Sequence, residues 1–210
     1  MENILHLHGL PFDALRPVIN LDEMPLQLLG EVVAPLPMKK DAPKKVDYEY
    51  VRRGTAALFV AVEPLSGQRI IEVSQRRTKA DYCRFLQKVA AAYPAATKIV
   101  LIQDNLNTHH SGSFYENLPP EQAFALAQRF EFHYTPKKAS WLNIAELELS
   151  ALARLCLSRR IETIEQLRSE LEAVVKQRNE QRTKIQWQFS IEQARDKLSR
   201  HYDTVKTILT

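Results

Sequence analysis

The chain has 210 residues, 45% of them hydrophobic, which suits one mixed α/β domain with a sizeable core. Its net charge of +4 is compatible with an anionic partner, and Cys83 and Cys156, isolated at apolar positions, indicate reduced thiols and no disulfide scaffold. No stretch approaches about 18 consecutive apolar residues and the first residues do not resemble a signal peptide, so we expect a soluble cytoplasmic protein without membrane contact.

The N-terminal part of the chain is predicted to hold one strand and one long loop. Residues 1–16 show no clear periodicity and are expected to be an irregular lead-in. Residues 17–22 form an apolar run that reads as a buried strand, and residues 23–25 are expected to end its regularity. Residues 35–47 contain three prolines and four lysines, which predicts an exposed loop.

Two further strands, a helix and a fourth strand follow this loop. Residues 55–62 and 69–74 are apolar runs separated by a turn with Pro and Gly, which is typical of a β-hairpin. Thr78 is placed to cap a helix whose apolar residues recur at intervals of three and four up to Pro94. Residues 98–103 then form another apolar run, which predicts a buried strand.

The remaining residues complete an alternation of helices and strands. Residues 121–129 are predicted to be a helix, residues 130–134 a short strand, and the chain from Ser140 helical almost to its end. This order implies a mixed five-stranded sheet with helices on both faces. The ribonuclease H-like fold has this order, with its first strand central and beside the fourth. We predict three regions: an irregular lead-in (1–16), a ribonuclease H-like core (17–160) and a helical C-terminal extension (161–210) that packs on the core.

Three acidic residues stand at the ends of the predicted elements. Asp22 and Asp104 each close an apolar strand, and Glu146 lies at the opening of a long helix. In a ribonuclease H-like sheet the two aspartates would be neighbours, and the helix could bring Glu146 over them. Three such carboxylates can hold two divalent cations about 4 Å apart for phosphodiester chemistry. Taken singly, each could equally be an ordinary loop or helix-surface acid.

The helical phase separates Glu146 from a second nearby acid. Apolar neighbours place Glu146 close to the buried face, with Asn143 one turn before it on the same side. Glu148 lies about 200° around the helix from Glu146, so we expect it to face solvent. His109 and His110 could suggest zinc, but their spacing favours a loop histidine that is hydrogen-bonded near the site.

Three sequence blocks resemble the catalytic blocks of DDE transposases, in particular the bacterial insertion-sequence branch of the mariner-like superfamily. The blocks are residues 18–29 (VINLDEMPLQLL), 102–109 (IQDNLNTH) and 134–149 (YTPKKASWLNIAELEL). The resemblance implies a ribonuclease H-like core in which Asp22, Asp104 and Glu146 bind two Mg²⁺ or Mn²⁺ ions. It also implies supporting roles for Asn105, His109 and Asn143.

The resemblance further implies the reaction and the partners. The reaction would be hydrolytic nicking at the ends of a mobile element, followed by attack of the freed 3′-hydroxyl on target DNA. The partners would be double-stranded DNA and a second copy in a homodimeric synaptic complex, located at a bacterial nucleoid. Relatives carry helix-turn-helix modules before the first strand, and residues 1–16 are too short for one. We therefore expect recognition of the element ends to come from a separate polypeptide, from a frameshifted product, or not at all.

One group of basic residues follows the first predicted strand and is expected to contact DNA phosphates without reading sequence. This group consists of Lys39, Lys40, Lys44, Lys45, Arg52 and Arg53. Later basic groups, including Lys176 and Arg178, are explained as well by a solvated helix face. The alternative to an enzyme is a truncated, non-catalytic remnant that binds DNA or a full-length transposase. A third reading is a ribonuclease H-like nuclease that acts on RNA–DNA hybrids.

Overall fold

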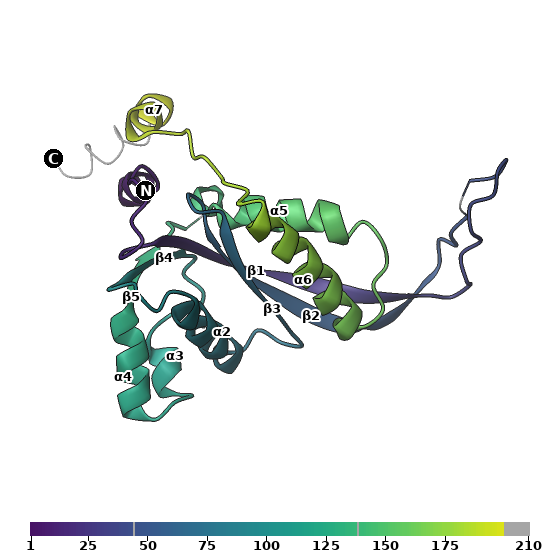
Figure 1. The fold of residues 1–210 in the computed structure, drawn as a ribbon, viewed down its shortest axis with the longest axis horizontal. Helices are drawn as coiled ribbons and strands as arrows, with labels where there is room; N and C mark the ends of the chain where they lie inside the picture. Colours follow the sequence, from purple (N-terminus) through teal and green to yellow (C-terminus); the bar gives the residue numbers. More distant parts are fainter. Residues whose placement is uncertain (44, 138, 200–210) are drawn as a thin grey trace.

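A five-stranded mixed sheet forms the centre of the computed structural model, which describes residues 1–43, 45–137 and 139–199 (Figure 1). The strand order is β3-β2-β1-β4-β5, so the first strand is central and lies beside the fourth, as predicted. The first three strands pair antiparallel, whereas β4 pairs parallel with both β1 and β5. The strands are β1 (Val18–Glu31), β2 (Tyr50–Glu63), β3 (Gln68–Ser74), β4 (Ile99–Gln103) and β5 (Phe130–Tyr134).

Helices cover both faces of this sheet. The first face carries α2, α3 and α4, and the second carries α5 and α6 over β2 and β3, with α1 and α7 over β4. The helices are α1 (Glu2–His8), α2 (Lys79–Ala92), α3 (Gly112–Tyr115), α4 (Pro120–Arg129), the 3₁₀ helix η1 (Ser140–Leu142), α5 (Ala145–Cys156), α6 (Ile164–Glu180) and α7 (Ile191–Lys197). None of these described helices is long and apolar enough to span a membrane.

Strand β2 shows why the apolar runs are continuous. Successive side chains of a strand point to opposite faces. Phe59 packs in the core under α2, whereas Leu58 and Val60 pack under α5 and α6. Because both faces are covered by helices, every position from Ala56 to Glu63 is buried. Cys83 and Cys156 are buried free thiols, as predicted, one in each of these two cores.

The predicted irregular lead-in is wrong for its first half, because residues 2–8 form α1. A helix of seven residues is too short to be stable alone. Ile4, Leu5 and Leu7 bury their side chains against β4 and η1, and this tertiary contact stabilises the helix. The proposed limits of the catalytic core and of the extension stay predictions, and residues 200–210 lie outside the described part.

Strand β1 does not end at residues 23–25 but continues to Glu31, which corrects the predicted boundary. Beyond Asn20 its ladder with β4 stops and only the β2 ladder continues. Pro25 is tolerated there because a proline lacks only the N–H donor, which is not needed on an open edge.

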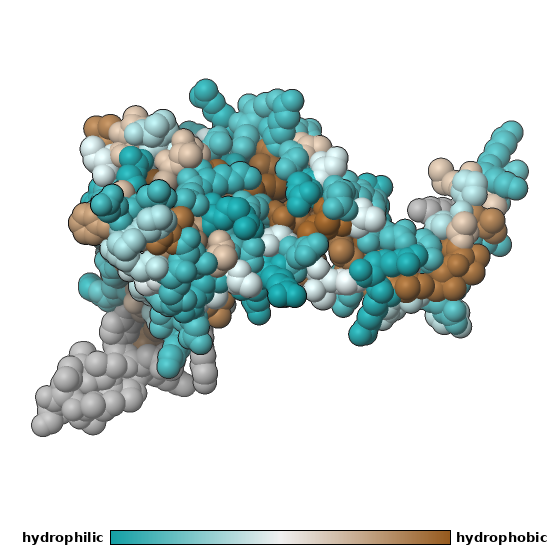
Figure 2. All heavy atoms as spheres, turned by 90° about the horizontal axis from the view of Figure 1, so that it is seen from below, coloured by the Kyte–Doolittle hydropathy of each residue, from teal (hydrophilic) through white to brown (hydrophobic). Residues whose placement is uncertain are grey.

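Residues 32–43 and 45–49 extend from the sheet as a projecting hairpin arm (Figure 1). Bridges pair Leu36 with Lys45 and Lys39 with Ala42, so the predicted exposed loop is exposed but has hairpin form. Figure 2 shows apolar and charged residues mixed along this arm, and its large apolar side chains include Met38 and Tyr48, 77% and 85% exposed.

The C-terminal region is less continuous than predicted, because residues 181–190 separate α6 from α7 without helical structure. In this stretch the ring of Trp187 packs in a tilted orientation against His8 of α1, with the ring centres 5.0 Å apart. His8 donates from Nε2 to the carbonyl oxygen of Leu142 at 2.8 Å, and burial lowers the pKa of His8, so the ring is neutral at pH 7. The N- and C-terminal segments thus meet at η1, the turn that precedes α5.

Candidate active site

The parallel pairing of β1 with β4 sets Asp22 and Asp104 at the same level of the sheet. Asn20 pairs with Ile102, and each aspartate lies two residues beyond this pair. Glu146 lies in the first turn of α5, which packs against β1 and β2. The three acids that the sequence singles out therefore come from the elements that were expected to bring them together.

Asn143 connects the start of α5 to β1. Its Nδ2 donates to the carbonyl oxygen of Leu21 at 2.7 Å, and its Oδ1 accepts from the backbone N–H of Ala145 at 3.2 Å. The side chain is buried, and it satisfies one of the N–H groups that the first turn of a helix leaves without a partner. Asn143 thus fixes the first turn of α5, and with it Glu146, relative to Asp22.

The electrostatic environment of Asp22 shows that the three carboxyl groups interact. Burial, together with the charges of Asp104 and Glu146, raises the pKa of Asp22 to about 6, against the opposing effects of the Glu23 backbone N–H and of His109. The charge of His109 therefore offsets only part of the cost of ionising Asp22. A divalent ion among the three carboxylates would supply the rest of the compensating charge.

The donor chemistry suits a hard cation such as Mg²⁺, which takes carboxylate oxygens and retains several waters. Within the described residues, no three His, Cys, Asp or Glu side chains already stand in the arrangement of a complete metal site. The fit therefore rests on the type of the three ligands and on the unbalanced charge at Asp22. The same finding gives no support to a zinc site at His109 and His110.

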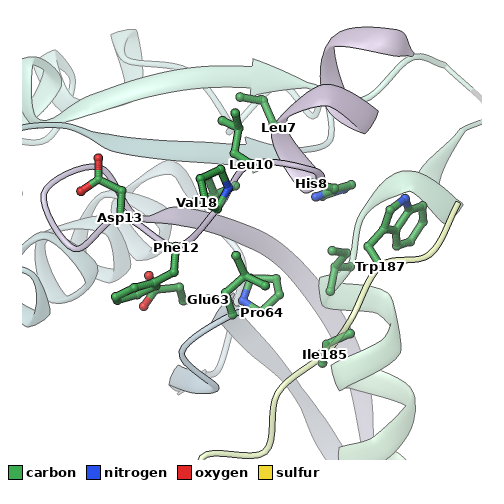
Figure 3. A pocket seen from close by; sticks show the side chains of 13 residues that line it. Leu7, His8, Leu10, Phe12, Asp13, Val18, Glu63, Pro64, Ile185 and Trp187 are labelled. Atoms are coloured by element: carbon green, nitrogen blue, oxygen red, sulfur yellow. The ribbon is translucent and has the colours of Figure 1, made fainter. Parts of the chain in front are cut away.

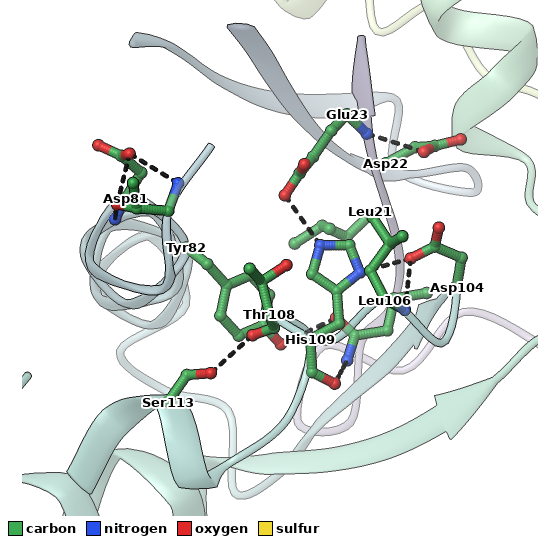
Figure 4. Close-up of polar contacts among 12 residues, drawn as sticks. Leu21, Asp22, Glu23, Asp81, Tyr82, Asp104, Leu106, Thr108, His109 and Ser113 are labelled. Carbon is green, nitrogen blue, oxygen red and sulfur yellow. Dashed lines mark hydrogen bonds and ion pairs between the residues drawn. The ribbon is translucent and has the colours of Figure 1, made fainter. Parts of the chain in front are cut away.

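His109 lies buried between two carboxylates (Figure 4). Its Nδ1 is 2.5 Å from Oδ1 of Asp104, and its Nε2 is 2.8 Å from Oε1 of Glu23. Burial alone would lower the pKa of His109, but the hydrogen bonds to Asp104 and Glu23 outweigh it and raise the pKa to about 9. At neutral pH the ring is therefore an imidazolium that donates from both nitrogens.

Aromatic and amide side chains behind His109 hold its loop. Tyr82 of α2 stacks on the imidazole with ring centres 4.8 Å apart. The Tyr82 hydroxyl donates to Oε1 of Gln103, and Nε2 of Gln103 donates to the carbonyl oxygen of His109. Glu23, Tyr82 and Gln103 were not identified from sequence. The sequence pattern could have identified Glu23, because it neighbours Asp22 on a strand and must therefore point to the opposite face of the sheet.

The remaining predicted site residues are exposed. Asn105 follows Asp104 directly and faces solvent, so its supporting role stays a prediction. Lys39, Lys40 and Lys45 are exposed on the arm, and Lys44 lies outside the described residues. Arg52 and Arg53 are exposed at the start of β2, where Arg53 forms an ion pair with Glu162 at 2.8 Å.

Glu148 does not face solvent, and this prediction is wrong. Its side chain is fully buried and pairs with Arg69 at 2.9 Å and with Arg178 at 2.8 Å. Burial would raise the pKa of Glu148, but the two arginines outweigh it and lower the pKa. The face of α5 opposite Glu146 is covered by α6, from which Arg178 comes. Arg178 consequently does not belong to a solvated helix face.

A separate pocket lies between α1, the β2–β3 turn and the segment before α7 (Figure 3). Mostly apolar side chains line it, among them Leu7, Phe12, Ile185 and Trp187. None of Asp22, Asp104 and Glu146 lines this pocket, so it is separate from the candidate site at β1, β4 and α5.

Residues 17–168 match the sequence profile of the DDE superfamily endonucleases, which covers most of the chain. The chain belongs to this family. Its expected membership of the DDE enzymes is confirmed, whereas the bacterial insertion-sequence branch stays a prediction. No curated protein matches this DDE endonuclease over its sequence.

Solved structures share its fold. The Mos1 mariner paired-end complex with Mn is 14% identical, with a TM-score of 0.54 over 87% of this chain and 56% of that chain. The Mos1 strand transfer complex is 13% identical, with a TM-score of 0.52 over 87% and 59% of the two chains. A simian T-cell lymphotropic virus intasome is 17% identical, with a TM-score of 0.50 over 79% and 51%.

At these identities the likeness establishes the fold alone. The mixed five-stranded sheet with helices on both faces is the ribonuclease H-like architecture that the sequence predicts. The DDE endonuclease chain spans only about half the length of the chains it matches.

Proposed function

We propose that the chain is the catalytic domain of a transposase, which cleaves DNA strands and joins them to a target with the help of Mg²⁺ or Mn²⁺. The observation that carries this proposal is that Asp22 and Asp104 each lie two residues beyond a paired position of neighbouring strands, with Glu146 on the helix that packs against β1 and β2. Membership of the DDE endonucleases supports it. The related Mos1 structures are complexes of a transposase with transposon ends or with a strand-transfer product, and one of them contains Mn.

Asp22, Asp104 and Glu146 would hold two divalent ions. When bound, such ions activate the attacking oxygen and stabilise the leaving oxygen of a phosphodiester. Asp22 from the central strand, Asp104 from the end of β4 and Glu146 from α5 would supply carboxylate oxygens to these ions. Asn143 keeps Glu146 in place through β1, and His109 keeps Asp104 in place through a charged hydrogen bond.

The overall reaction would proceed in two phosphoryl transfers. In the first, water attacks phosphorus at the element end and releases a 3′-hydroxyl and a 5′-phosphate. In the second, this 3′-hydroxyl attacks a target phosphodiester, so that one P–O bond forms as another breaks. The partners would be double-stranded DNA, bound in part through the basic residues of the arm, and a second copy of the chain in a synaptic complex.

A plasmid nicking assay tests the proposal. Wild-type protein should convert supercoiled DNA to nicked circles in Mn²⁺ or Mg²⁺ and not in EDTA. Asp104→Asn removes one carboxylate charge and should lower the nicking rate at least about 100-fold, because the variant loses a metal ligand.

Asp196→Asn, a change of an exposed acid on α7, is the matched control and should nick at the wild-type rate. Circular dichroism of each variant verifies that folding is retained. Equal nicking rates for wild type and folded Asp104→Asn would refute the proposed function.

A further inference from the structure

Strand β1 presents adjacent carboxylates to opposite faces of the sheet, as Figure 4 shows for Asp22 and Glu23. Asp22 pairs across the ladder with Val60, whose side chain belongs to the core under α5 and α6. Glu23 pairs with Phe59, which belongs to the core under α2. Only Asp22 therefore lies on the side of Glu146, and Glu23 needs another explanation.

Glu23 is a buried acid at a position where an apolar residue would pack without cost. Its side chain is 2% exposed. Oε1 contacts Nε2 of His109 at 2.8 Å, whereas Oε2 is buried and has no hydrogen-bond partner among the residues that the structure describes. Burying a carboxylate with incomplete hydrogen bonding opposes folding, so a stabilising role does not account for this residue.

The contacts of His109 connect Glu23 to Asp104. Asp104 is 35% exposed, whereas His109 is 1% exposed, so the chain of contacts runs from the interior to the open site. Within the described residues, both hydrogen bonds that Asp104 accepts end on Oδ1, from His109 Nδ1 and from the backbone N–H of Leu106. Oδ1 is thereby fixed, and Oδ2 is the oxygen available to a ligand.

The orientation of the imidazole depends on more than its bond to Asp104. Stacking on Tyr82 restrains the plane of the ring. Glu23 contacts Nε2 while Asp104 contacts Nδ1, so small displacements of the ring toward or away from Asp104 are restrained at both nitrogens. Tyr82, Glu23 and Asp104 together define one position for the ring.

We propose that Glu23 is a positioning residue for Asp104: through His109 it fixes Oδ1 of Asp104 and so presents Oδ2 to a divalent cation. This inference rests on the proposed function, because it assumes that Asp104 is a metal ligand. Hydrogen-bond partners of metal ligands commonly change metal affinity about 10-fold to 100-fold when they are removed. Glu23 is expected to act in this range without touching metal or DNA.

Two substitutions in the full 210-residue chain separate positioning from packing. Glu23→Leu removes the acceptor and fills the same space with an apolar side chain, an exchange that buried ionic groups often tolerate. Glu23→Gln retains an oxygen that can accept from His109. The matched control is Glu63→Leu, because Glu63 is also a buried strand acid but hydrogen-bonds Ser66 and Tyr93, away from Asp104.

The measurement is Mn²⁺ binding by isothermal titration calorimetry, with thermal unfolding as the test of folding. Glu23→Leu should raise the dissociation constant at least about 10-fold, and Glu23→Gln should restore it to within about 3-fold of wild type. Glu63→Leu should bind Mn²⁺ as wild type does. A folded Glu23→Leu protein with wild-type affinity overturns the inference, as does a Glu23→Gln protein as weak as Glu23→Leu.

A double-mutant cycle tests whether Glu23 acts through His109. In a His109→Ala background, Glu23→Leu should change the dissociation constant by less than about 2-fold, because the connecting ring is absent. If Glu23→Leu raises the dissociation constant by the same factor with and without His109, the inference is contradicted.

Asp104→Asn distinguishes the two proposals. If this variant binds Mn²⁺ as wild type does, the proposed function fails together with the inference. If it binds weakly while Glu23→Leu binds normally, only the inference fails.

Discussion

Asp22 is a half-buried acid and Glu148 a fully buried one, and their charges are balanced in different ways. Glu148 has two arginines as partners, whereas Asp22 has other carboxylates nearby and a pKa raised to about 6. A site that repels its own charge is destabilising in the absence of a cation, and such local cost is typical of functional residues. This difference separates the two acids more clearly than their positions in the sequence do.

Asp22→Asn should stabilise the protein in the absence of divalent ions. The folded pKa of Asp22 is raised above its value of 3.8, so the ionised form disfavours folding at neutral pH. Removing this charge should add about 1–3 kcal/mol to the free energy of unfolding at pH 7, since one pKa unit corresponds to about 1.4 kcal/mol.

The sign of the effect can be tested through pH. Between pH 6 and pH 3.8 the folded state binds the extra proton, so the advantage of Asp22→Asn should shrink as pH falls through this window and vanish below it. Urea unfolding in EDTA at pH 7 and pH 4 provides the measurement. A variant less stable than wild type at pH 7 would contradict the electrostatic account of the site.

Sequence reasoning identified individual acids but not their full environments. Asp22, Asp104 and Glu146 could be selected because they end apolar runs or open a helix, and His109 because it follows Asp104 in a loop. The contact between His109 and Glu23 joins residues 86 positions apart, which no local pattern encodes. Alternation along β1 would have placed Glu23 opposite Asp22, but its partner depends on how the 105–111 loop folds back over α2.

At the scale of elements, α5 is held between Asn143 at its start and Glu148 on its far side. Helical phase correctly predicts that Glu146 and Glu148 point in different directions. Helical phase does not reveal that α6 and β3 cover the side of α5 on which Glu148 lies, because a helix's own sequence does not specify its neighbours. Glu148 therefore anchors the helix that carries Glu146.

Glu148→Gln should weaken the protein by about 3–5 kcal/mol, because it leaves the buried Arg69 without a full counter-charge. Arg69 and Arg178 both form their ion pair with Glu148, and the Arg69 side chain is fully buried. Urea unfolding at pH 7 measures the loss. The double variant Arg69→Met with Glu148→Leu is the control and should lose less than Glu148→Gln alone, since the fully buried charge of Arg69 is removed with its partner and only Arg178, which reaches solvent, loses its ion pair. A double variant that loses as much stability as Glu148→Gln, or more, would show that the unpaired charge of Arg69 is not the cause.

The predictability of each element follows from where its stability originates. Strands β4 and β5 and helices α2 and α4 were placed to within a few residues, because contiguous apolar runs and local caps such as Thr78 define them. Helix α1 and the second half of β1 were not placed, since the first depends on packing against β4 and the second on pairing with β2. Long-range contacts decide both.

At the scale of the whole molecule, the hairpin arm is the feature most exposed to solvent partners. Its lysines are expected to contact phosphates, and such contacts give salt-dependent binding without sequence preference. The double substitution Lys39→Ala with Lys40→Ala should lower affinity for duplex DNA and reduce the slope of log affinity against log salt by about 2, one unit for each lost phosphate contact.

Fluorescence anisotropy with a labelled duplex at several salt concentrations measures this slope. Thermal unfolding should be unchanged, because both side chains are exposed. Lys197→Ala on α7, a lysine that lies over Phe189, is the matched control and should leave the slope unaltered. An unchanged slope for the arm variant would remove the arm from the DNA interface.

A side chain from the C-terminal half of the chain holds the base of the arm in place. Arg160, in the connection between α5 and α6, pairs with Glu31 and donates to the carbonyl oxygens of Asp47, Tyr48 and Glu49. These contacts hold the root of the arm against the segment that follows α5, so the start of the arm has a defined position relative to the helix that carries Glu146.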